Sequence, residues 1–264
     1  MPNDLPSLEK TRESAAPVDE AEVTIDTADG VCDAALLHPA GAGRRPGVVM
    51  FTDIRGLRPV FRDMARRLAG HGYAVLVPNP FYRTRKAPVL TGPFDFTKPE
   101  DRAKMAELTS PLTAEAKTRD VTAYLAFLDT LPTVDAKAKA GMVGYCMGAP
   151  YALMAAAVAP DRVGAAASFH GSALVTDRPD SPHLLIARTK AAYYFGIAES
   201  DDVRQPDAKD KLREALGAAR LPAGIEVYAG CQHGWCVADG AVYHQDQAER
   251  AFGELVALFG KTLK

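Results

Sequence analysis

Short apolar runs alternate with amphipathic segments along most of this 264-residue chain. At residues 47–51 and 73–77 apolar residues occupy successive positions, which predicts strands buried on both faces. Other runs predict further strands at 22–25, 31–37, 139–143, 163–169, 191–197 and 225–229. Helical spacing of apolar residues predicts helices at 60–70, 113–131, 149–159, 207–219 and 246–259. This alternation favours the α/β class, with a mostly parallel sheet flanked by helices on both faces.

Two segments depart from this pattern. Residues 1–21 are polar and contain proline, and we expect them to form a flexible N-terminal extension. Residues 81–111 contain several prolines and no clear periodicity, so we expect an irregular excursion long enough to serve as a lid. A chain of this length suits one large domain better than two small ones, so residues 22–264 are predicted to form a single α/β domain.

The composition argues against several classes of protein. Hydrophobic residues make up 47% of the chain and charged residues 24%, as in an ordinary soluble globular protein. The formal net charge is −2 and basic residues are dispersed, so neither nucleic acid nor an anionic membrane is expected as a partner. No apolar run predicts a transmembrane helix, and the first residues lack the pattern of a secretory signal. We expect a cytoplasmic protein that is a monomer or a homodimer.

The strongest chemical signal is the sequence Gly144-Tyr145-Cys146-Met147-Gly148. It follows a predicted strand and precedes a predicted helix, which is the setting of a nucleophile elbow with Cys in place of Ser. Both glycines are required because a Cβ at either position would collide with the strand or the helix. The turn places Cys146 at a helix N-terminus, where free N–H groups favour a thiolate. The alternative is a buried structural cysteine, so the prediction depends on partners further along the chain.

An acidic partner is expected just beyond the predicted strand 191–197. Asp201 and Asp202 follow this strand, and either carboxylate could orient a histidine and stabilise its charged form. Glu199 is a third candidate. A helix cap or a solvated turn is the commonplace role for such a pair of aspartates.

A histidine follows in the order that a nucleophile elbow requires. His233 lies in a glycine-containing loop after a late strand, downstream of both Cys146 and Asp201. His170 and His183 also lie in or after segments that could border the sheet. A surface or capping role is the default for each of these two.

The cysteines allow a competing interpretation. Four of them are too few for a disulfide scaffold, so we expect free thiols at Cys32, Cys146, Cys231 and Cys236. Cys231, His233 and Cys236 could together hold a zinc ion, since thiolates and imidazole suit that metal. Their spacing resembles no common zinc motif and a fourth ligand is not evident, so we expect no bound metal.

These motifs together resemble the dienelactone hydrolase family, which acts on carboxymethylenebutenolides and has the α/β-hydrolase fold. The similarity covers roughly residues 45–260, and it is carried by the following segments: Asp53-Ile54-Arg55-Gly56, Gly72-Tyr73-Ala74, Gly144-Tyr145-Cys146-Met147-Gly148, the Asp201 loop and His233-Gly234-Trp235.

The resemblance assigns roles to several residues. It implies Cys146 as nucleophile, His233 as base and Asp201 as the acid. It also implies that the backbone N–H groups of Ile54 and Met147 form the oxyanion hole. Tyr145 and Trp235, beside the nucleophile and the histidine, are expected to contact the substrate.

The chain departs from the family pattern at two places. Asp53 stands where the family has a glutamate that helps to convert the resting thiol to a thiolate, and Asp is one methylene shorter. Arg83 matches one of two arginines that bind the substrate carboxylate, but Val237 stands at the position of the other. A single arginine grips a carboxylate less firmly than two, and Arg55 or Arg58 could take the second role.

The sequence therefore predicts a hydrolase that cleaves a lactone or small activated ester through an acyl-enzyme on Cys146. The substrate is expected to bear a carboxylate. No cofactor is expected, and the small-molecule substrate is the expected partner. The alternative is a non-catalytic or ligand-binding member of the same fold, because a fold alone does not ensure chemistry.

Overall fold

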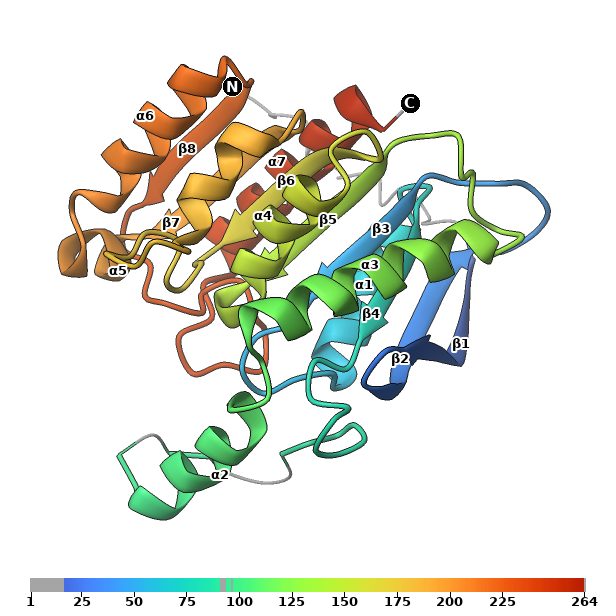
Figure 1. Ribbon diagram of the computed structural model, residues 1–264, viewed down its shortest axis with the longest axis horizontal. Helices are drawn as coiled ribbons and strands as arrows, with labels where there is room; N and C mark the ends of the chain where they lie inside the picture. Colours follow the sequence, from blue (N-terminus) through green and yellow to red (C-terminus); the bar gives the residue numbers. More distant parts are fainter. Residues whose placement is uncertain (1–16, 91–93, 96, 264) are drawn as a thin grey trace, which may run out of the picture.

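The computed structural model describes residues 17–90, 94–95 and 97–263, and the strands in this part of the chain form one eight-stranded sheet (Figure 1). Its order is β1-β2-β4-β3-β5-β6-β7-β8, and every strand except β2 runs in the same direction. The strands are β1 (Val18–Thr27), β2 (Gly30–Pro39), β3 (Gly47–Phe51), β4 (Ala74–Pro78), β5 (Ala140–Tyr145), β6 (Val163–Phe169), β7 (Ala192–Ala198) and β8 (Ala223–Tyr228).

Helices cover both faces of the sheet, which confirms the predicted α/β class. Helices α1 and α7 pack on one face, and α3, α4 and α6 pack on the other (Figure 1). The helices are α1 (Pro59–Ala69), α2 (Pro99–Thr109), α3 (Ala114–Thr130), α4 (Ala149–Val158), α5 (Glu199–Arg204), α6 (Ala208–Ala219) and α7 (Gln245–Thr262), with short 3₁₀ turns η1 (Cys146–Gly148) and η2 (Pro182–Arg188).

Strand β3 shows why successive apolar residues are needed. Val48 and Met50 are buried in the core beneath α1 and α7, whereas Val49 and Phe51 are buried in the core beneath α3 and α4. A strand with helices on both faces has no solvent-facing side on which polar residues could alternate. The sequence pattern therefore identified the central strands correctly.

Two local expectations were wrong. Residues 81–111 were expected to be irregular, but they contain α2, which begins at Pro99 and buries little more than Met105 and Leu108. A helix with so few buried positions has no apolar stripe for sequence analysis to detect. Strand β1 begins at Val18, so the last residues of the expected extension, 18–21, pair with β2. The other residues of that extension, except Pro17, lie outside the described part of the chain.

The topology brings the carboxyl ends of the parallel strands to one edge. Strand β5 lies between β3 and β6, and β7 and β8 follow on the same side. Helix α2 stands beyond this edge, away from the sheet (Figure 1). Loops that leave β3, β5, β6, β7 and β8 therefore meet in one region, where ligands bind in open α/β sheets.

No helix within the described ranges is both long and apolar enough to cross a membrane.

Candidate active site

Cys146 occupies a sharp turn between β5 and α4. Its φ of 52° lies in the left-handed region, which residues with a Cβ rarely adopt. A Cβ on Gly144 would stand 2.3 Å from the carbonyl oxygen of Gly148, and one on Gly148 would stand 2.5 Å from the carbonyl oxygen of Phe51. Both glycines are therefore required, as the sequence analysis argued, and the turn is that of a nucleophile elbow.

Asp201 is the acid that meets His233. The Nδ1 atom of His233 lies 2.7 Å from Oδ2 of Asp201, which stands in α5 beyond the end of β7. The two alternative acids have other partners. Asp202 accepts a hydrogen bond from Lys209 at 2.6 Å, and Glu199 accepts one from the N–H of Gly230 at 3.1 Å.

The other side of the His233 ring lies against Cys146. Burial opposes a charge on His233, but hydrogen bonds with Asp201 and Cys146 outweigh it and raise the pKa of His233 to about 10. The imidazole of His233 therefore holds its proton more firmly than a free histidine does. The backbone of the loop is fixed as well, because the N–H of His233 donates to Oγ of Ser200 at 3.0 Å.

Ser172 is a neighbour of Cys146 that the sequence analysis missed. Its Oγ lies 3.5 Å from Sγ of Cys146, and its N–H donates to the carbonyl oxygen of Cys146 at 3.1 Å. The signal that could have revealed it is topological. Ser172 follows β6, which pairs with β5 in parallel, so the residues after both strands lie at the same edge.

The expected oxyanion donors lie in suitable backbone settings. Met147 is in the first turn after β5, where N–H groups have no partner within the helix. Ile54 is in a turn closed by the hydrogen bond from Gly56 N–H to the Asp53 carbonyl at 3.0 Å. Within the described residues, the N–H of Ile54 has no hydrogen-bond acceptor. The N–H of Ile54 is therefore available for an added oxygen, and Met147 lies where a second donor would be expected.

Asp53 has different partners from those that the family resemblance suggested. Its carboxylate accepts hydrogen bonds from both Nη atoms of Arg58, at 2.7 and 2.8 Å, and from the N–H of Arg55 at 2.9 Å. Arg58 is 8% exposed and also donates to Asp239 at 2.8 and 3.0 Å. Asp53 thus shapes the turn that carries Ile54, and Arg58 is not available as a substrate clamp.

Arg83 is also held by carboxylates of the protein. It donates to Asp120 at 2.7 and 2.9 Å and to Asp29 at 2.5 Å, and its side chain is 11% exposed. The Asp120 side chain is fully buried. Carboxylates of the protein thus occupy the donors of Arg83, and a role in gripping the substrate stays an untested prediction. Val237, at the position of the second family arginine, is buried.

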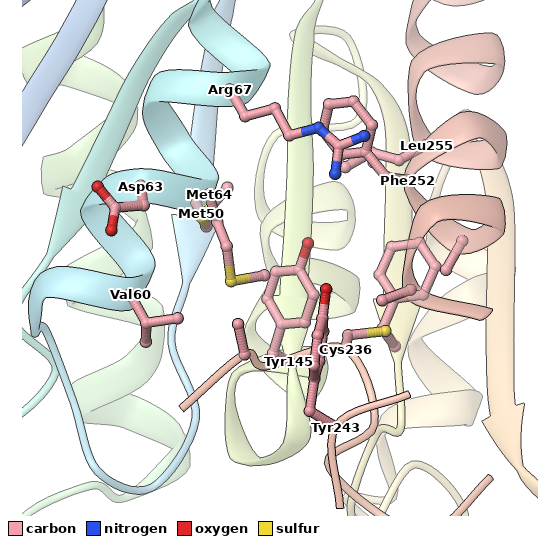
Figure 2. Close-up of a pocket in the computed structure, with 14 residues that line it drawn as sticks. Met50, Val60, Asp63, Met64, Arg67, Tyr145, Cys236, Tyr243, Phe252 and Leu255 are labelled. Carbon is pink, nitrogen blue, oxygen red and sulfur yellow. The ribbon is translucent and has the colours of Figure 1, made fainter. Parts of the chain in front are cut away.

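Tyr145 and Trp235 are not brought to the thiol of Cys146. Tyr145 lies on the face of the sheet under α1 and α7, where it packs against Phe61 and Phe169 (Figure 2). Trp235 is fully buried, and its ring centroid lies 4.9 Å from that of Tyr228. Both are buried residues of the core under α1 and α7, and their contact with a substrate stays a prediction.

His170 lies directly beside His233. It is buried, with ring centroids 5.1 Å from His233 and 5.3 Å from Trp235. Burial, together with the charge on His233, keeps the pKa of His170 well below its ordinary value, so this ring is neutral. The planes of the His170 and His233 rings meet at 70°, in an edge-type contact. His183, the other histidine considered, is hydrogen-bonded to Ser181 instead.

The zinc alternative has no support from the geometry. In the described part of the chain, no group of three or more His, Cys, Asp or Glu side chains is placed to hold a metal ion. The cysteines are free thiols, as expected, and Cys231 and Cys236 are buried.

A mostly parallel sheet with an elbow turn after a central strand, and an acid and a histidine after later strands, defines an α/β-hydrolase. Residues 32–263 match the dienelactone hydrolase family. The chain belongs to this family and is a hydrolase of its type.

Known proteins of this family are similar over nearly the whole chain. A carboxymethylenebutenolidase of Rhodococcus opacus is 28% identical over 224 residues, which cover 83% of each chain. A solved structure from Klebsiella pneumoniae, assigned as a dienelactone hydrolase, has a TM-score of 0.81 at 23% identity and covers 92% of this chain and 99% of its own. A dienelactone hydrolase-like promiscuous phosphotriesterase from metagenomic libraries has a TM-score of 0.73 at 20% identity, over 93% of this chain and 99% of its own. These structures share the fold.

Proposed function

We propose that the protein hydrolyses a lactone or small activated ester through an acyl-enzyme, with Cys146 as nucleophile. His233 acts as acid and base, and Asp201 orients it. The observation that carries the proposal is the position of His233, which is hydrogen-bonded to Asp201 at 2.7 Å and meets Cys146 on its other side. A nucleophile, a base and an orienting acid in series is the arrangement that activates a weak nucleophile.

In the first step the thiolate of Cys146 attacks the carbonyl carbon of the ester. The carbonyl oxygen becomes an oxyanion, which accepts hydrogen bonds from the N–H groups of Ile54 and Met147. The C–O bond to the leaving group then breaks, and the departing oxygen takes the proton of His233. The product of this step is a thioester on Cys146 and a neutral His233.

In the second step water replaces the thiolate. The acylated sulfur carries no charge, so the partner that stabilised a protonated His233 is lost and the neutral ring can act as a base. His233 removes a proton from water, and the resulting hydroxide attacks the thioester carbonyl. The thiolate leaves, the acid product forms, and the imidazolium–thiolate pair is restored.

The leaving group limits the range of substrates. A thiolate is itself a good leaving group, so the first intermediate returns to substrate unless the ester oxygen departs easily. Enolates and activated alkoxides meet this condition, whereas amides do not. The name of the Rhodococcus relative, carboxymethylenebutenolidase, fits such an enol lactone.

We propose that a carboxylate on the substrate meets Arg55 rather than Arg83. Arg55 follows Ile54 in the chain, its side chain is 35% exposed, and it has one contact with Asp239 at 3.3 Å. Met147 packs against the small cluster of Phe81, Val89 and Leu108, which gives the site an apolar wall. A compact apolar acyl group suits that wall.

We also propose that the enzyme acts in the cytoplasm, where its thiols stay reduced. All four cysteines are free, and a thiol nucleophile requires reducing conditions. A small-molecule ester or lactone is the proposed partner of the site.

Mass spectrometry of the intact protein tests the nucleophile. After brief incubation with 4-nitrophenyl acetate, wild type should carry one acetyl group and release nitrophenolate. Cys146→Ala should show neither, and Cys236→Ala is the matched control because it removes a different thiol. Full turnover by Cys146→Ala would refute the nucleophile assignment. Neither adduct nor turnover in wild type, with lactones as well as esters, would favour the ligand-binding alternative.

A further inference from the structure

A cavity of about 210 Å³ lies between α1 and α7, on the face of the sheet opposite α4 (Figure 2). Its walls are mainly apolar and include Met64, Phe252 and Leu255. The volume corresponds to roughly seven water molecules, which is room for one substituted ring. None of the residues proposed for catalysis lines it, so the cavity is a separate site.

One polar group that faces this cavity has no hydrogen-bond partner among the described residues. Tyr145 is 4% exposed, and its hydroxyl forms no hydrogen bond with any described residue. Figure 2 shows the hydroxyl pointing into the cavity, away from the end of the strand that carries it. Burial raises the pKa of Tyr145 above its ordinary range, so the group remains a neutral donor. The hydroxyl is not one of the fully buried unpartnered atoms of the described residues, so it is open to the cavity, where a ligand oxygen can accept its hydrogen bond.

A cation faces the same end of the cavity. The guanidinium of Arg67 extends from α1 above the Tyr145 hydroxyl, and its charge acts on that hydroxyl (Figure 2). Arg67 is held there by Glu249 and by the ring of Phe252, 3.8 Å from its carbon to the ring centroid. Tyr243 lines the cavity from the loop after β8. Both Nη atoms of Arg67 donate to Glu249, at 2.6 and 2.5 Å, so the polar groups at this end are a phenol donor and an ion pair, above apolar and aromatic walls.

We propose that this cavity binds a small aromatic carboxylate. The ring would lie against Met64, Phe252 and Leu255, and one carboxylate oxygen would accept the hydrogen bond of Tyr145 beside Arg67. Aromatic walls favour a ring in offset or edge contact, and a charged acceptor forms a stronger hydrogen bond than a neutral one. The site would exist whatever reaction Cys146 performs.

The cavity nevertheless touches both catalytic segments. Tyr145 is adjacent to Cys146 in the chain, and Cys236, which lines the cavity, is on the loop that carries His233. A ligand in the cavity would contact the end of β5 and the loop that carries His233, on the side away from the proposed catalytic site. We expect occupancy to change the setting of Cys146 and His233 without blocking access to them.

Isothermal titration calorimetry with benzoate tests the proposal directly. Benzoate should bind wild type and Cys146→Ala with the same Kd, because the cavity lies outside the proposed catalytic site. Tyr145→Phe, which removes only the hydroxyl, should weaken binding about tenfold or more. Ala248→Leu, which fills the cavity from α7, should abolish binding. Benzyl alcohol, which has the ring without the charge, should bind more weakly than benzoate.

Circular dichroism and thermal unfolding establish that each variant is folded. Tyr145→Phe should keep the stability of wild type, so it remains informative even if Ala248→Leu is poorly folded. Absence of binding up to about 10 mM, where even a millimolar Kd would be detected, would overturn the proposal. An equal Kd in wild type and Tyr145→Phe would also overturn it. Loss of binding in Cys146→Ala alone would place the benzoate in the catalytic site instead.

Discussion

Replacing Arg83 by methionine distinguishes a structural from a substrate-binding role. In the structure Arg83 donates to Asp120 through two hydrogen bonds, at 2.7 and 2.9 Å, and the Asp120 side chain is fully buried. The variant would leave this carboxylate in the interior with the hydroxyl of Tyr82, at 2.7 Å, as its remaining side-chain partner. Methionine retains most of the apolar bulk of the arginine, so the loss is mainly electrostatic.

The size of the effect follows from burial. Removing one partner of a buried ion pair destabilises a protein by about 3–5 kcal/mol. For a chain of this size each kcal/mol corresponds to about 2 °C in Tm, so Arg83→Met should unfold about 6–10 °C below wild type. Arg119→Met is the matched control, since Arg119 binds Asp29, another Arg83 partner, but its side chain is 45% exposed. That variant should lose less than about 1 kcal/mol.

Two assays together distinguish a structural role of Arg83 from a role in substrate binding. Thermal and urea unfolding give the stability of Arg83→Met, of Asp120→Leu and of the double variant, which should recover much of the loss because no charge is left alone. Steady-state kinetics compare a carboxylated ester with its neutral analogue, and the ratio of their KM values should not change in Arg83→Met. Unchanged stability together with a KM increase confined to the carboxylated ester would refute the structural role.

Three other predictions concern the elbow, the histidine and the oxyanion turn. Gly148→Ala should destabilise the protein by about 1–3 kcal/mol and abolish ester hydrolysis, because its Cβ would meet two backbone oxygens at 2.5 Å. Gly253→Ala in α7 has open space around it and should fold at least as well as wild type. Equal stability of the two variants in urea unfolding would contradict this prediction. The raised pKa of His233 means that the folded chain binds the imidazole proton more tightly than the unfolded chain does. The resulting stabilisation of the folded state is complete below the ordinary pKa of 6.5 and is lost as the pH rises through about 10. The stability gap between wild type and Asp201→Asn should therefore shrink between pH 6.5 and pH 10.5, and a gap that grows over this range would count against the ion pair. Asp53→Asn should lower kcat through the Ile54 turn and leave the rate of Cys146 alkylation by iodoacetamide unchanged; a changed alkylation rate would restore the role in thiolate activation.

The elements and the turn at Cys146 could be predicted because they depend on local chemistry. A strand such as β3 must be apolar at every position when helices cover both faces, and the two glycines around Cys146 are fixed by contacts within a few residues. Parallel strands bring the residues after their carboxyl ends to one edge, which groups Cys146 and His233 with an acid after the predicted strand 191–197; the choice of Asp201 among three acids came from the family resemblance. These features leave a signature in the sequence itself.

The direction of side chains could not be predicted in the same way. Arg83 is turned to Asp120 by a pairing between segments distant in sequence, and Trp235 is buried by a core that only the assembled sheet creates. Tyr145 was open to a better prediction. Alternation along β5 puts it on the same face as Val143, which belongs to the core under α1 and α7.

Strand β1 has a consequence for how copies of this protein behave at high concentration. Among the described residues it forms one edge of the sheet, and an edge strand can template the addition of a strand from another molecule. Asp19, Glu20, Glu22 and Asp26 are exposed along it. Glu20 and Glu22 already form ion pairs with Arg62 of α1, so in an edge-to-edge fibre of β1 strands the repulsion that opposes growth comes mainly from Asp19 and Asp26. The acidic residues of β1 therefore disfavour polymerisation at this edge of the sheet.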